Sequence, residues 1–397
     1  MTTADPAFSR LAAEFASLAS DDRRARGVPL SLHIDLTYRC DLDCEHCYLD
    51  RKTDWPELRN DELLDLVDQA ADLGVLRLTW SGGEPFARPD FESLVERASQ
   101  HGLVSRIKTH AGNITAARAA WLASQVVDRV EVSVYSLNAR VHDAITRVPG
   151  SFEATLQGIA EMRRIGVEVS ISWVAMRSSV HEGADLLRYF SALGCRVSIG
   201  VGIQPDNGLS QGIEQLDLGD TELVQAYRVI QQQRIMQGDD DGRVVRLDAT
   251  AAPCGAARSS VYVAPDGAVT PCVMFPMEIG HLREQTLAEI WHQSERRKEI
   301  VAWTNADRSD CLSCSAGGNC FYCPGEAFKR TGDFRAAPDV FHQRTRAKMK
   351  AFEAEYGHRF EPAFWAGIPE HTEAPPRVRK AHFPILRPGT TGSRRNA

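Results

Sequence analysis

The stretch that decides the fold reads Asp35-Leu36-Thr37-Tyr38-Arg39-Cys40-Asp41-Leu42-Asp43-Cys44-Glu45-His46-Cys47-Tyr48. It follows residues 30–36, which have the apolar pattern of a β-strand. Three cysteines spaced Cys-x3-Cys-x2-Cys therefore lie on a loop after the first strand. Three thiolates can bind three irons of a [4Fe–4S] cubane, which normally takes four, and one iron is then open to a small molecule. A zinc site is the alternative, but His46 is badly placed beside Cys47 to supply the fourth ligand.

The whole chain has the composition of a globular protein. It has 397 residues, 43% hydrophobic and 25% charged, with a formal net charge of −7. No window reaches the ~20 uninterrupted apolar residues of a membrane span. Residues 1–25 lack the apolar run of a signal peptide, so we expect a cytoplasmic protein. An acidic chain without a basic stripe is a poor nucleic-acid binder, so we expect neither nucleic acid nor membrane as a partner.

Strand and helix patterns alternate along the first half of the chain. The expected strands cover residues 30–36, 75–80, 104–109, 127–136, 168–175 and 196–203. The expected helices cover residues 61–73, 90–100, 114–124, 152–165 and 183–193. This alternation indicates an α/β fold with a parallel sheet and helices outside it. It fits a partial (β/α)6 TIM-like barrel, short of the complete eight units, or an open doubly wound sheet.

The composition changes along the chain and predicts six segments. They are a helical lead-in (1–28), the partial barrel (29–215), a linker helix region (216–250), a small cysteine-rich domain (251–345), a C-terminal helix (346–368) and a tail (369–397). The cysteine-rich domain should hold helices and a short β-hairpin, with Asp266-Gly267 as its turn. The tail is rich in proline and arginine and is expected to be largely disordered.

The ten cysteines are clustered rather than scattered. In a reducing compartment, clustered cysteines more often bind metal or do redox chemistry than form disulfides. Besides the three on the first loop, a second set comprises Cys254, Cys272, Cys311, Cys314, Cys320 and Cys323. These two sets predict more than one metal centre. Cys195 stands alone and is expected to be a buried structural thiol.

The cysteine loop resembles that of the radical S-adenosylmethionine (radical SAM) enzymes. A second motif, Trp80-Ser81-Gly82-Gly83-Glu84-Pro85, follows the second strand, where that family binds the amino group of SAM. The resemblance implies that SAM chelates the open iron and that this loop receives its ammonium. Glycine lets backbone carbonyls approach closely, and Glu84 adds a negative acceptor. Gly82, Gly83, Glu84 and Pro85 are therefore predicted to bind SAM.

Further candidates for SAM contacts lie after other strands. Ser136, Asn138 and Arg147 follow the fourth strand, at the sheet edge where ligands of parallel sheets bind. Tyr48 follows the last cysteine and could flank the adenine. A plain turn, cap or packing role is the alternative for each. Residues 108–113 depart from the Thr-Asn-Gly-like turn that the family often has after the third strand, so no role is predicted for them.

The second cysteine set, with residues 280–291 between its parts, is similar to the SPASM extension of radical SAM enzymes. That extension usually holds two auxiliary iron–sulfur clusters. By the family pattern, Cys254, Cys272 and Cys323 would hold the inner cluster, and Cys311, Cys314 and Cys320 the outer one.

Each auxiliary cluster would lack one protein thiolate. The family pattern has a further cysteine where this chain reads Pro338-Asp339-Val340-Phe341-His342. His342 or Asp339 could complete the outer cluster, because imidazole can replace thiolate on iron. One auxiliary cluster with spare thiols, and a zinc ion in the 311–323 run, stay open as alternatives.

The resemblance implies a radical SAM oxidoreductase. Reductive cleavage of SAM would give a 5′-deoxyadenosyl radical that takes a hydrogen atom from the substrate. Residues 133–152 resemble the peptide-modifying members, so we expect maturation of a ribosomally made precursor peptide. The expected change is a crosslink, a thioether or an epimerisation.

The expected partners are the precursor peptide and a cellular electron donor such as flavodoxin or ferredoxin. Because residues 1–28 are too few for the leader-binding domain of some relatives, we also expect a separate leader-peptide-binding protein, unless the precursor binds directly. No catalytic base or second hydrogen donor is predicted.

Two other functions stay open. A tetrapyrrole side-chain or sulfatase-maturing activity shares this architecture. A non-catalytic iron–sulfur electron carrier or scaffold would also bind clusters, but it has no need of the SAM loop at residues 82–85.

Overall fold

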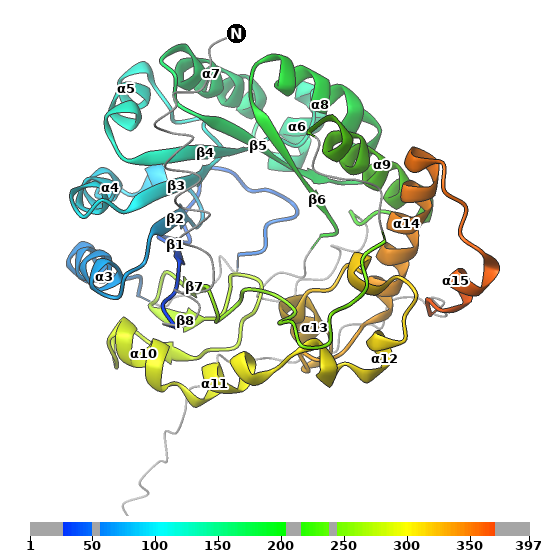
Figure 1. Ribbon diagram of the computed structural model, residues 1–397. Coiled ribbons are helices and arrows are strands. Elements are labelled where there is room, and N and C mark those ends of the chain that lie inside the picture. Colours follow the sequence, from blue (N-terminus) through cyan, green and yellow to red (C-terminus); the bar gives the residue numbers. More distant parts are fainter. Residues whose placement is uncertain (1–26, 50–55, 204–215, 238–243, 370–397) are drawn as a thin grey trace, which may run out of the picture.

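The computed structural model describes residues 27–49, 56–203, 216–237 and 244–369. Figure 1 shows strands that curve into a partial barrel, with helices on its outer side and a smaller helical part closing the open side. The predictions of a helical lead-in and a disordered tail fall on residues that lie outside these ranges.

Six parallel strands form the barrel wall. They are β1 (Ser31–Asp35), β2 (Arg77–Ser81), β3 (Val104–Thr109), β4 (Val127–Ser133), β5 (Val169–Ala175) and β6 (Arg196–Val201). Each strand pairs with the next in sequence order, from β1 to β6. A doubly wound sheet would reverse its strand order at a switch point. The partial (β/α)6 barrel is therefore confirmed, and the doubly wound alternative is wrong.

The helices between the strands cover the outside of the barrel. They are α3 (Asn60–Asp72), α4 (Phe91–Gln100), α5 (Ala116–Ser124), α6 (Ala139–Thr146), α7 (Ser151–Arg164) and α8 (Gly183–Ala192), with short 3-10 turns η1 (Pro85–Ala87) and η2 (Val180–Glu182). Trp80 of β2 is fully buried and meets Phe91 of α4 edge-on, with ring centroids 6.1 Å apart. Because side chains alternate along a strand, the neighbours of Trp80 face the inside of the barrel.

The cysteine-rich part begins as an extension of the barrel sheet. Its strands are β7 (Ser260–Val263), β8 (Ala268–Thr270) and β9 (Gly280–His281). The hairpin of β7 and β8 is confirmed, and Gly267 in its turn has the positive φ, +98°, that favours glycine. β7 also pairs in parallel with β1, so that one sheet of nine strands runs through both parts.

The remaining helices pack around this extension and the open side of the barrel. They are α9 (Asp220–Gln237), α10 (Leu287–Gln293), α11 (Glu295–Ala302), α12 (Ser309–Leu312), α13 (Pro324–Thr331), α14 (Asp339–Tyr356) and α15 (Pro362–Ala366), with 3-10 turns η4 (Asn305–Asp307) and η5 (Gly317–Asn319). Among the described residues, no helix is both long and apolar enough to cross a membrane.

The C-terminal helix differs from its predicted bounds. α14 begins at Asp339, directly after Pro338, and Gly357, with φ +67°, follows its end at Tyr356. Proline is well suited to the start of a helix, where its missing N–H has no intrahelical partner. Because α14 starts earlier than predicted and packs along α9, His342 lies on its first turns rather than before it.

Candidate functional site

The loop that carries Cys40, Cys44 and Cys47 is fixed by backbone hydrogen bonds to the end of α6. Asp43 N donates to Thr146 O over 3.0 Å, and Glu45 N donates to Ile145 O over 2.9 Å. The three cysteines are partly buried and form no disulfide. Three thiols therefore lie on one anchored loop at the carboxyl end of the barrel.

The glycine loop after β2 touches the backbone just before the first cysteine. Gly83 N donates to Thr37 O over 2.7 Å, and Glu84 N donates to Arg39 O over 2.9 Å. A Cβ on Gly83 would lie 2.1 Å from Arg39 O, and one on Gly82 would lie 2.7 Å from Thr37 O. Gly82 also has φ +122°. Only glycine at both positions lets the two loops make this contact.

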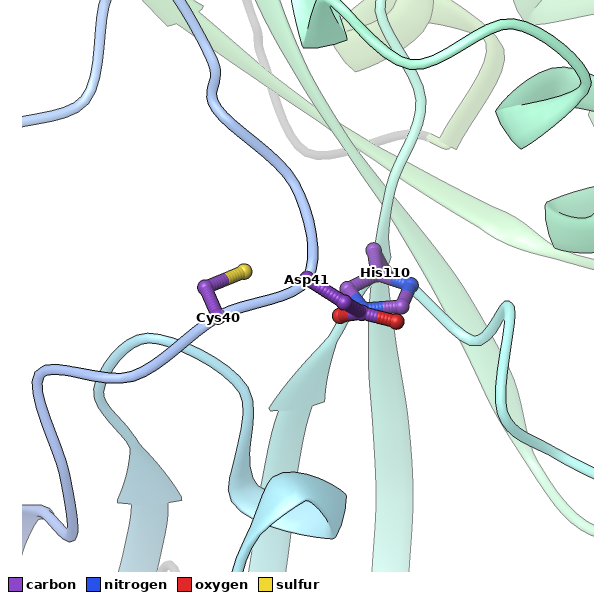
Figure 2. A group of neighbouring side chains, drawn as sticks. All are labelled: Cys40, Asp41 and His110. Atoms are coloured by element: carbon purple, nitrogen blue, oxygen red, sulfur yellow. The ribbon is translucent and has the colours of Figure 1, made fainter.

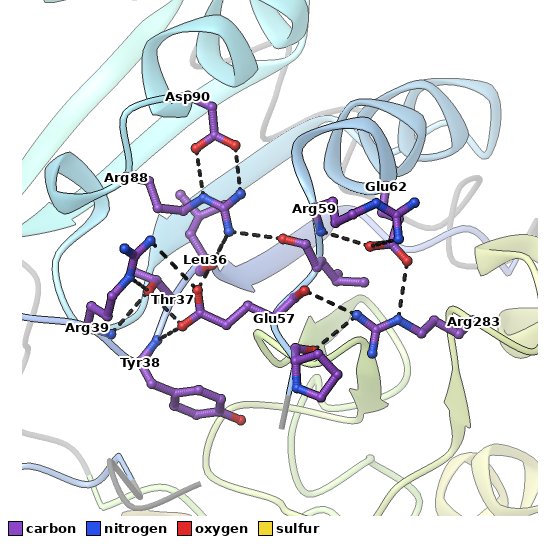
Figure 3. Close-up of polar contacts among 12 residues, drawn as sticks. Leu36, Thr37, Tyr38, Arg39, Glu57, Arg59, Glu62, Arg88, Asp90 and Arg283 are labelled. Carbon is purple, nitrogen blue, oxygen red and sulfur yellow. Dashed lines mark hydrogen bonds and ion pairs between the residues drawn. The ribbon is translucent and has the colours of Figure 1, made fainter. Parts of the chain in front are cut away.

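A partly buried polar network holds the segment that leads to Cys40, as Figure 3 shows. Glu57 accepts hydrogen bonds from Thr37 Oγ1 and Tyr38 N, both over 2.8 Å. Arg88, which is buried, donates to Leu36 O over 2.9 Å. These bonds satisfy the backbone at the end of β1 and give the cysteine loop a rigid base.

Glu84 is fully buried, and its carboxylate faces the end of β3. It accepts hydrogen bonds from Thr109 Oγ1 over 2.8 Å, and from His110 N and Phe86 N over 3.1 Å. Burial raises the pKa of Glu84 above its ordinary value, although His110 and Thr109 act in the opposite direction. The carboxylate therefore binds protein donors and fixes the glycine loop onto β3.

His110 connects this carboxylate to the cysteine loop. Its Nε2 lies 2.7 Å from Asp41 Oδ1 and 3.2 Å from Glu84 Oε2. Gly112 N donates to His110 Nδ1 over 3.0 Å, which places the ring proton on Nε2 in the neutral form. The hydrogen bond from His110 lowers the pKa of Asp41 to about 2. Figure 2 shows the side chains of Asp41 and His110 beside Cys40.

Sequence reasoning missed Asp41 and His110. Cys40, Asp41 and His110 bring three potential ligand atoms within 4.8 Å of one another, and within the described ranges they are the only such group. The signal in the sequence was the departure of residues 108–113 from the Thr-Asn-Gly-like turn of the family. That departure could be interpreted only if the acidic partner of His110 were known, and this partner, Asp41, lies far from residues 108–113 along the chain.

The predicted residues after β4 have turn and cap contacts. Ser136 Oγ lies 2.8 Å from the carboxylate of Glu182, and the side chain of Asn138 caps α6. Arg147, at φ +59°, is exposed and forms an ion pair with Asp43 of the cysteine loop over 3.3 Å. Asn138 and Arg147 thus lie at the two ends of α6, next to the anchor points of that loop.

Tyr48 lies in a buried polar group at the carboxyl end of β1. Its hydroxyl donates to Asp35 Oδ2 over 3.3 Å, and the hydroxyl of Tyr262 from β7 donates to the same atom over 2.8 Å. His33 Nε2 lies 3.2 Å from Asp35 Oδ1. Burial and then the charge of Asp35 raise the pKa of both phenols, which therefore remain hydrogen-bond donors. Sequence reasoning missed Asp35 and Tyr262.

The inner face of the barrel carries more cations than carboxylates across β2, β3 and β4. The side chains are Arg77, Arg106, Lys108 and Arg129, with Asp128 and Glu131. Arg106 pairs with Asp128, and Lys108 with Glu131, each over 2.6 Å. Burial and then the charge of Arg106 lower the pKa of Arg129, whose Nε lies 3.8 Å from Asp128 Oδ2. This surplus of positive charge favours an anionic group inside the barrel.

The second cysteine set forms two groups of neighbouring thiols. Cys272 lies close enough to Cys323 and Cys254 to interact electrostatically, and Cys320 does so with Cys314 and Cys311. Burial, reinforced by these neighbours, raises the pKa of Cys272 to about 11. All six are free thiols, and Cys195, before β6, is free and buried, as expected. A metal that binds thiolate would compensate for the cost of ionising such buried groups.

His342 lies on α14, the helix that contacts the second of these groups. Thr345, three residues further on, donates its hydroxyl to Cys320 Sγ over 3.3 Å. His342 Nδ1 lies 3.8 Å from Asp339 Oδ1. The role of His342 as a cluster ligand stays a prediction.

Two family models match this chain. The model of the radical SAM superfamily matches residues 34–190, and the model of SPASM, an iron–sulfur cluster-binding domain, matches residues 254–323. Together they cover more than half of the chain and include all nine clustered cysteines.

Curated relatives align with most of this chain. It is 26% identical to an AdoMet-dependent heme synthase of Methanosarcina barkeri, covering 77% of this chain and 94% of the relative. It is 29% identical to a PqqA peptide cyclase of Streptomyces rochei, covering 79% of this chain and 89% of the relative. It is 29% identical to the mycofactocin maturase MftC of Mycolicibacterium smegmatis, covering 75% of this chain and 78% of the relative.

Solved structures share the fold. anSMEcpe with bound AdoMet superposes with a TM-score of 0.63 at 16% identity, covering 86% of this chain and 98% of that one. Streptococcus suis SuiB bound to its precursor peptide SuiA superposes with a TM-score of 0.57 at 15% identity, covering 76% and 73%. At these identities the superpositions show a common architecture.

Proposed function

Because the chain belongs to the radical SAM superfamily and carries a SPASM iron–sulfur domain, we propose that it is a peptide maturase. In this proposal Cys40, Cys44 and Cys47 hold a [4Fe–4S] cluster whose open iron binds SAM. The observation that carries it is the contact between Gly82-Gly83 and the backbone of residues 37–39. It supports a SAM loop that lies directly against the cluster loop.

The residues of the site fit these cofactors. Three thiols on one anchored loop, none of them in a disulfide, would leave one corner of a cubane without a protein ligand. The two glycines let their loop lie against the backbone that precedes Cys40, where any Cβ would clash. On the cluster loop itself, His46 Nδ1 is buried and has no hydrogen-bond partner in the described part of the chain, so a polar atom is available to a ligand.

When bound, the reduced cluster and SAM supply a 5′-deoxyadenosyl radical that removes a hydrogen atom from the substrate. The chain itself binds and orients the cofactors. Gly82 and Gly83 present backbone carbonyls to the SAM ammonium, and Pro85 begins the turn η1 that ends this loop. Glu84, whose carboxylate already binds Thr109 and His110, positions the loop rather than contacting SAM through its carboxylate.

The other predicted SAM contacts have proposed roles at the rim of the site. Tyr48, held through its hydroxyl by Asp35, presents its ring beside the third cysteine. Ser136 and Asn138 shape the turn from β4 to α6, and Arg147 adds a cation next to the cysteine loop.

We propose that the SPASM region holds two auxiliary clusters, which would supply electron acceptors for an oxidative reaction. The two groups of neighbouring thiols support the inner set Cys254, Cys272 and Cys323 and the outer set Cys311, Cys314 and Cys320. His342 is the proposed fourth ligand of the outer cluster.

The proposed substrate is a precursor peptide whose reacting segment carries an acidic group. The relatives named PqqA peptide cyclase and mycofactocin maturase, and the SuiB–SuiA complex, support a peptide. The cationic inner face of the barrel supports the acidic group, which would lie close to Lys108. We further propose a cytoplasmic enzyme that takes electrons from a flavodoxin or ferredoxin and uses a separate leader-binding protein.

The heme synthase relatives favour a second candidate, a reaction on a tetrapyrrole side chain. Both candidates are tested with the reconstituted enzyme, SAM and a reductant. One reaction contains a synthetic candidate precursor peptide with acidic side chains, and the other a tetrapyrrole that bears carboxylate side chains. Loss of two hydrogens from the peptide, measured by mass spectrometry, would support the maturase. A change in the tetrapyrrole alone would contradict it.

A further inference from the structure

The turn that follows β3 is held in a conformation that a plain connection does not require. Ala111 is fully buried and has φ +61°, a left-handed conformation that residues with a side chain rarely adopt. α7 holds the turn in place. Thr155 Oγ1 donates to His110 O over 2.8 Å, and Gly158 packs so closely that its Cβ would lie 2.1 Å from Ala111 O. Strain of this kind persists only where the surroundings impose it, and it is concentrated at functional sites.

This turn directs the ring of His110 between the two loops of the site (Figure 2). The ring is buried, and its Nδ1 accepts from Gly112 N, so the proton of the neutral ring lies on Nε2. Nε2 lies 2.7 Å from Asp41 Oδ1 and 3.2 Å from Glu84 Oε2. Asn113 Nδ2 donates to the other oxygen of Asp41 over 3.1 Å. One turn therefore contacts the cysteine loop through Asp41 and the glycine loop through Glu84.

Cys40 is held on both sides along the chain by this arrangement. Before it, the backbone of residues 37–39 accepts two hydrogen bonds from the glycine loop. Directly after it, Asp41 binds His110. Cys44, by contrast, lies between the two backbone bonds that fix the cysteine loop to α6. The position of the first cysteine is therefore set by the glycine loop and the end of β3, and that of the second by α6.

We propose that His110 is a positioning residue that keeps Cys40 and the glycine loop aligned for SAM. The inference rests on the proposed function, since it requires SAM to bind at the first cluster. SAM would be held by the cluster on one side and by the glycine loop on the other, so its affinity depends on their alignment. Groups that orient the residues around a metal site affect ligand binding without contacting the ligand. The departure of residues 108–113 from the turn of the family then has a physical role.

His110→Phe is the substitution that tests this role. It removes both ring nitrogens and keeps a ring of similar size in the buried position. Glu84 retains its other hydrogen-bond donors, and Asp41 is 52% exposed, so neither carboxylate is left buried without a donor. His101→Phe is the matched control. His101 Nε2 also lies 2.7 Å from an aspartate oxygen, Asp68 Oδ1, but at the end of α4 on the outer side of the barrel.

The experiment uses the reconstituted holoenzyme and measures three quantities. They are the iron content, the Kd of SAM by anaerobic calorimetry, and the nitrogen hyperfine coupling of the reduced cluster with SAM that is isotope-labelled in its amino group. For His110→Phe we expect full iron content, roughly tenfold weaker SAM binding from the loss of a charged hydrogen bond, and an altered coupling. The coupling reports how the amino group lies at the cluster, which a general loss of stability would not change. His101→Phe should match the wild type in all three.

Wild-type SAM affinity or an unchanged nitrogen coupling in a fully loaded His110→Phe enzyme would overturn the inference. If that variant loses iron from the first cluster, Asp41→Ala decides, because it removes the partner on the cysteine loop and keeps His110. Weaker SAM binding at full iron content then supports the inference, and wild-type binding or a second loss of iron overturns it. A wild-type protein without any SAM-responsive cluster would instead refute the proposed function.

Discussion

Gly83→Ala is the substitution that most directly separates the SAM loop from the cysteine loop. The added Cβ would lie 2.1 Å from Arg39 O and 2.5 Å from Arg39 C. Both neighbours are backbone atoms of a segment that Glu57 and Arg88 hold in place, so the clash cannot be relieved by turning a side chain. The glycine loop must therefore move away from residues 37–39.

The size of the effect follows from the contacts that would be lost. Gly83 N to Thr37 O, at 2.7 Å, and Glu84 N to Arg39 O, at 2.9 Å, are the two backbone bonds between the loops. Each is worth about 1 kcal/mol net. A loss of about 2 kcal/mol from the SAM-binding arrangement weakens SAM binding roughly 30-fold.

The assay is the Kd of SAM for the reconstituted enzyme, measured by calorimetry under anaerobic conditions. Gly200→Ala in β6 is the matched control, because its Cβ would meet nothing closer than 3.7 Å. It should bind SAM as the wild type does. A Gly83→Ala enzyme with a full first cluster and wild-type affinity would refute the argument that this contact shapes the SAM site.

Three further predictions concern the auxiliary region and the barrel. Arg344→Met removes a guanidinium that is 1% exposed and lies 2.8 Å from the fully buried Glu326. The free energy of unfolding, measured with denaturant, should fall by about 3–5 kcal/mol, and a fall below about 1 kcal/mol would contradict the buried pair. Cys272→Ala should lower the iron content by about four atoms while 5′-deoxyadenosine still forms and peptide product is lost; an unchanged iron content would exclude Cys272 as a ligand. Lys108→Gln should raise the KM for the acidic peptide roughly tenfold, from the loss of a charged hydrogen bond, with SAM cleavage unchanged; an equal KM would contradict an acidic group near Lys108.

The parts of the fold that depend on local pattern were predictable from the sequence. The six barrel strands alternate apolar and polar residues, and their bounds agree with the prediction to within a few residues, the largest difference being the end of β4. α6 was missed because it is short and begins directly after the turn that follows β4. The parallel pairing of β7 with β1 joins residues more than 200 positions apart, and no local pattern encodes it.

The functional site shows the same division between residues that a local pattern predicts and contacts that only the fold creates. The cysteines and the two glycines were found because their spacing alone carries the chemistry. The contacts of Asp41 with His110, and of Tyr262 with Asp35, bring together separate segments through the curvature of the sheet. Glu84 was identified as a site residue, but only the fold shows that its carboxylate binds Thr109 and His110.

The central claim is that the first three cysteines hold a cluster that cleaves SAM. The most direct measurement is formation of 5′-deoxyadenosine by the reduced, reconstituted enzyme, with iron content determined on the same samples. We predict about twelve irons and SAM cleavage for the wild type, and about four fewer irons with no cleavage for Cys40→Ala/Cys44→Ala/Cys47→Ala. Cys195→Ala, at the buried cysteine outside both sets, should match the wild type in both measurements. A fully loaded wild type that does not cleave SAM, or a triple variant that still does, would contradict the account.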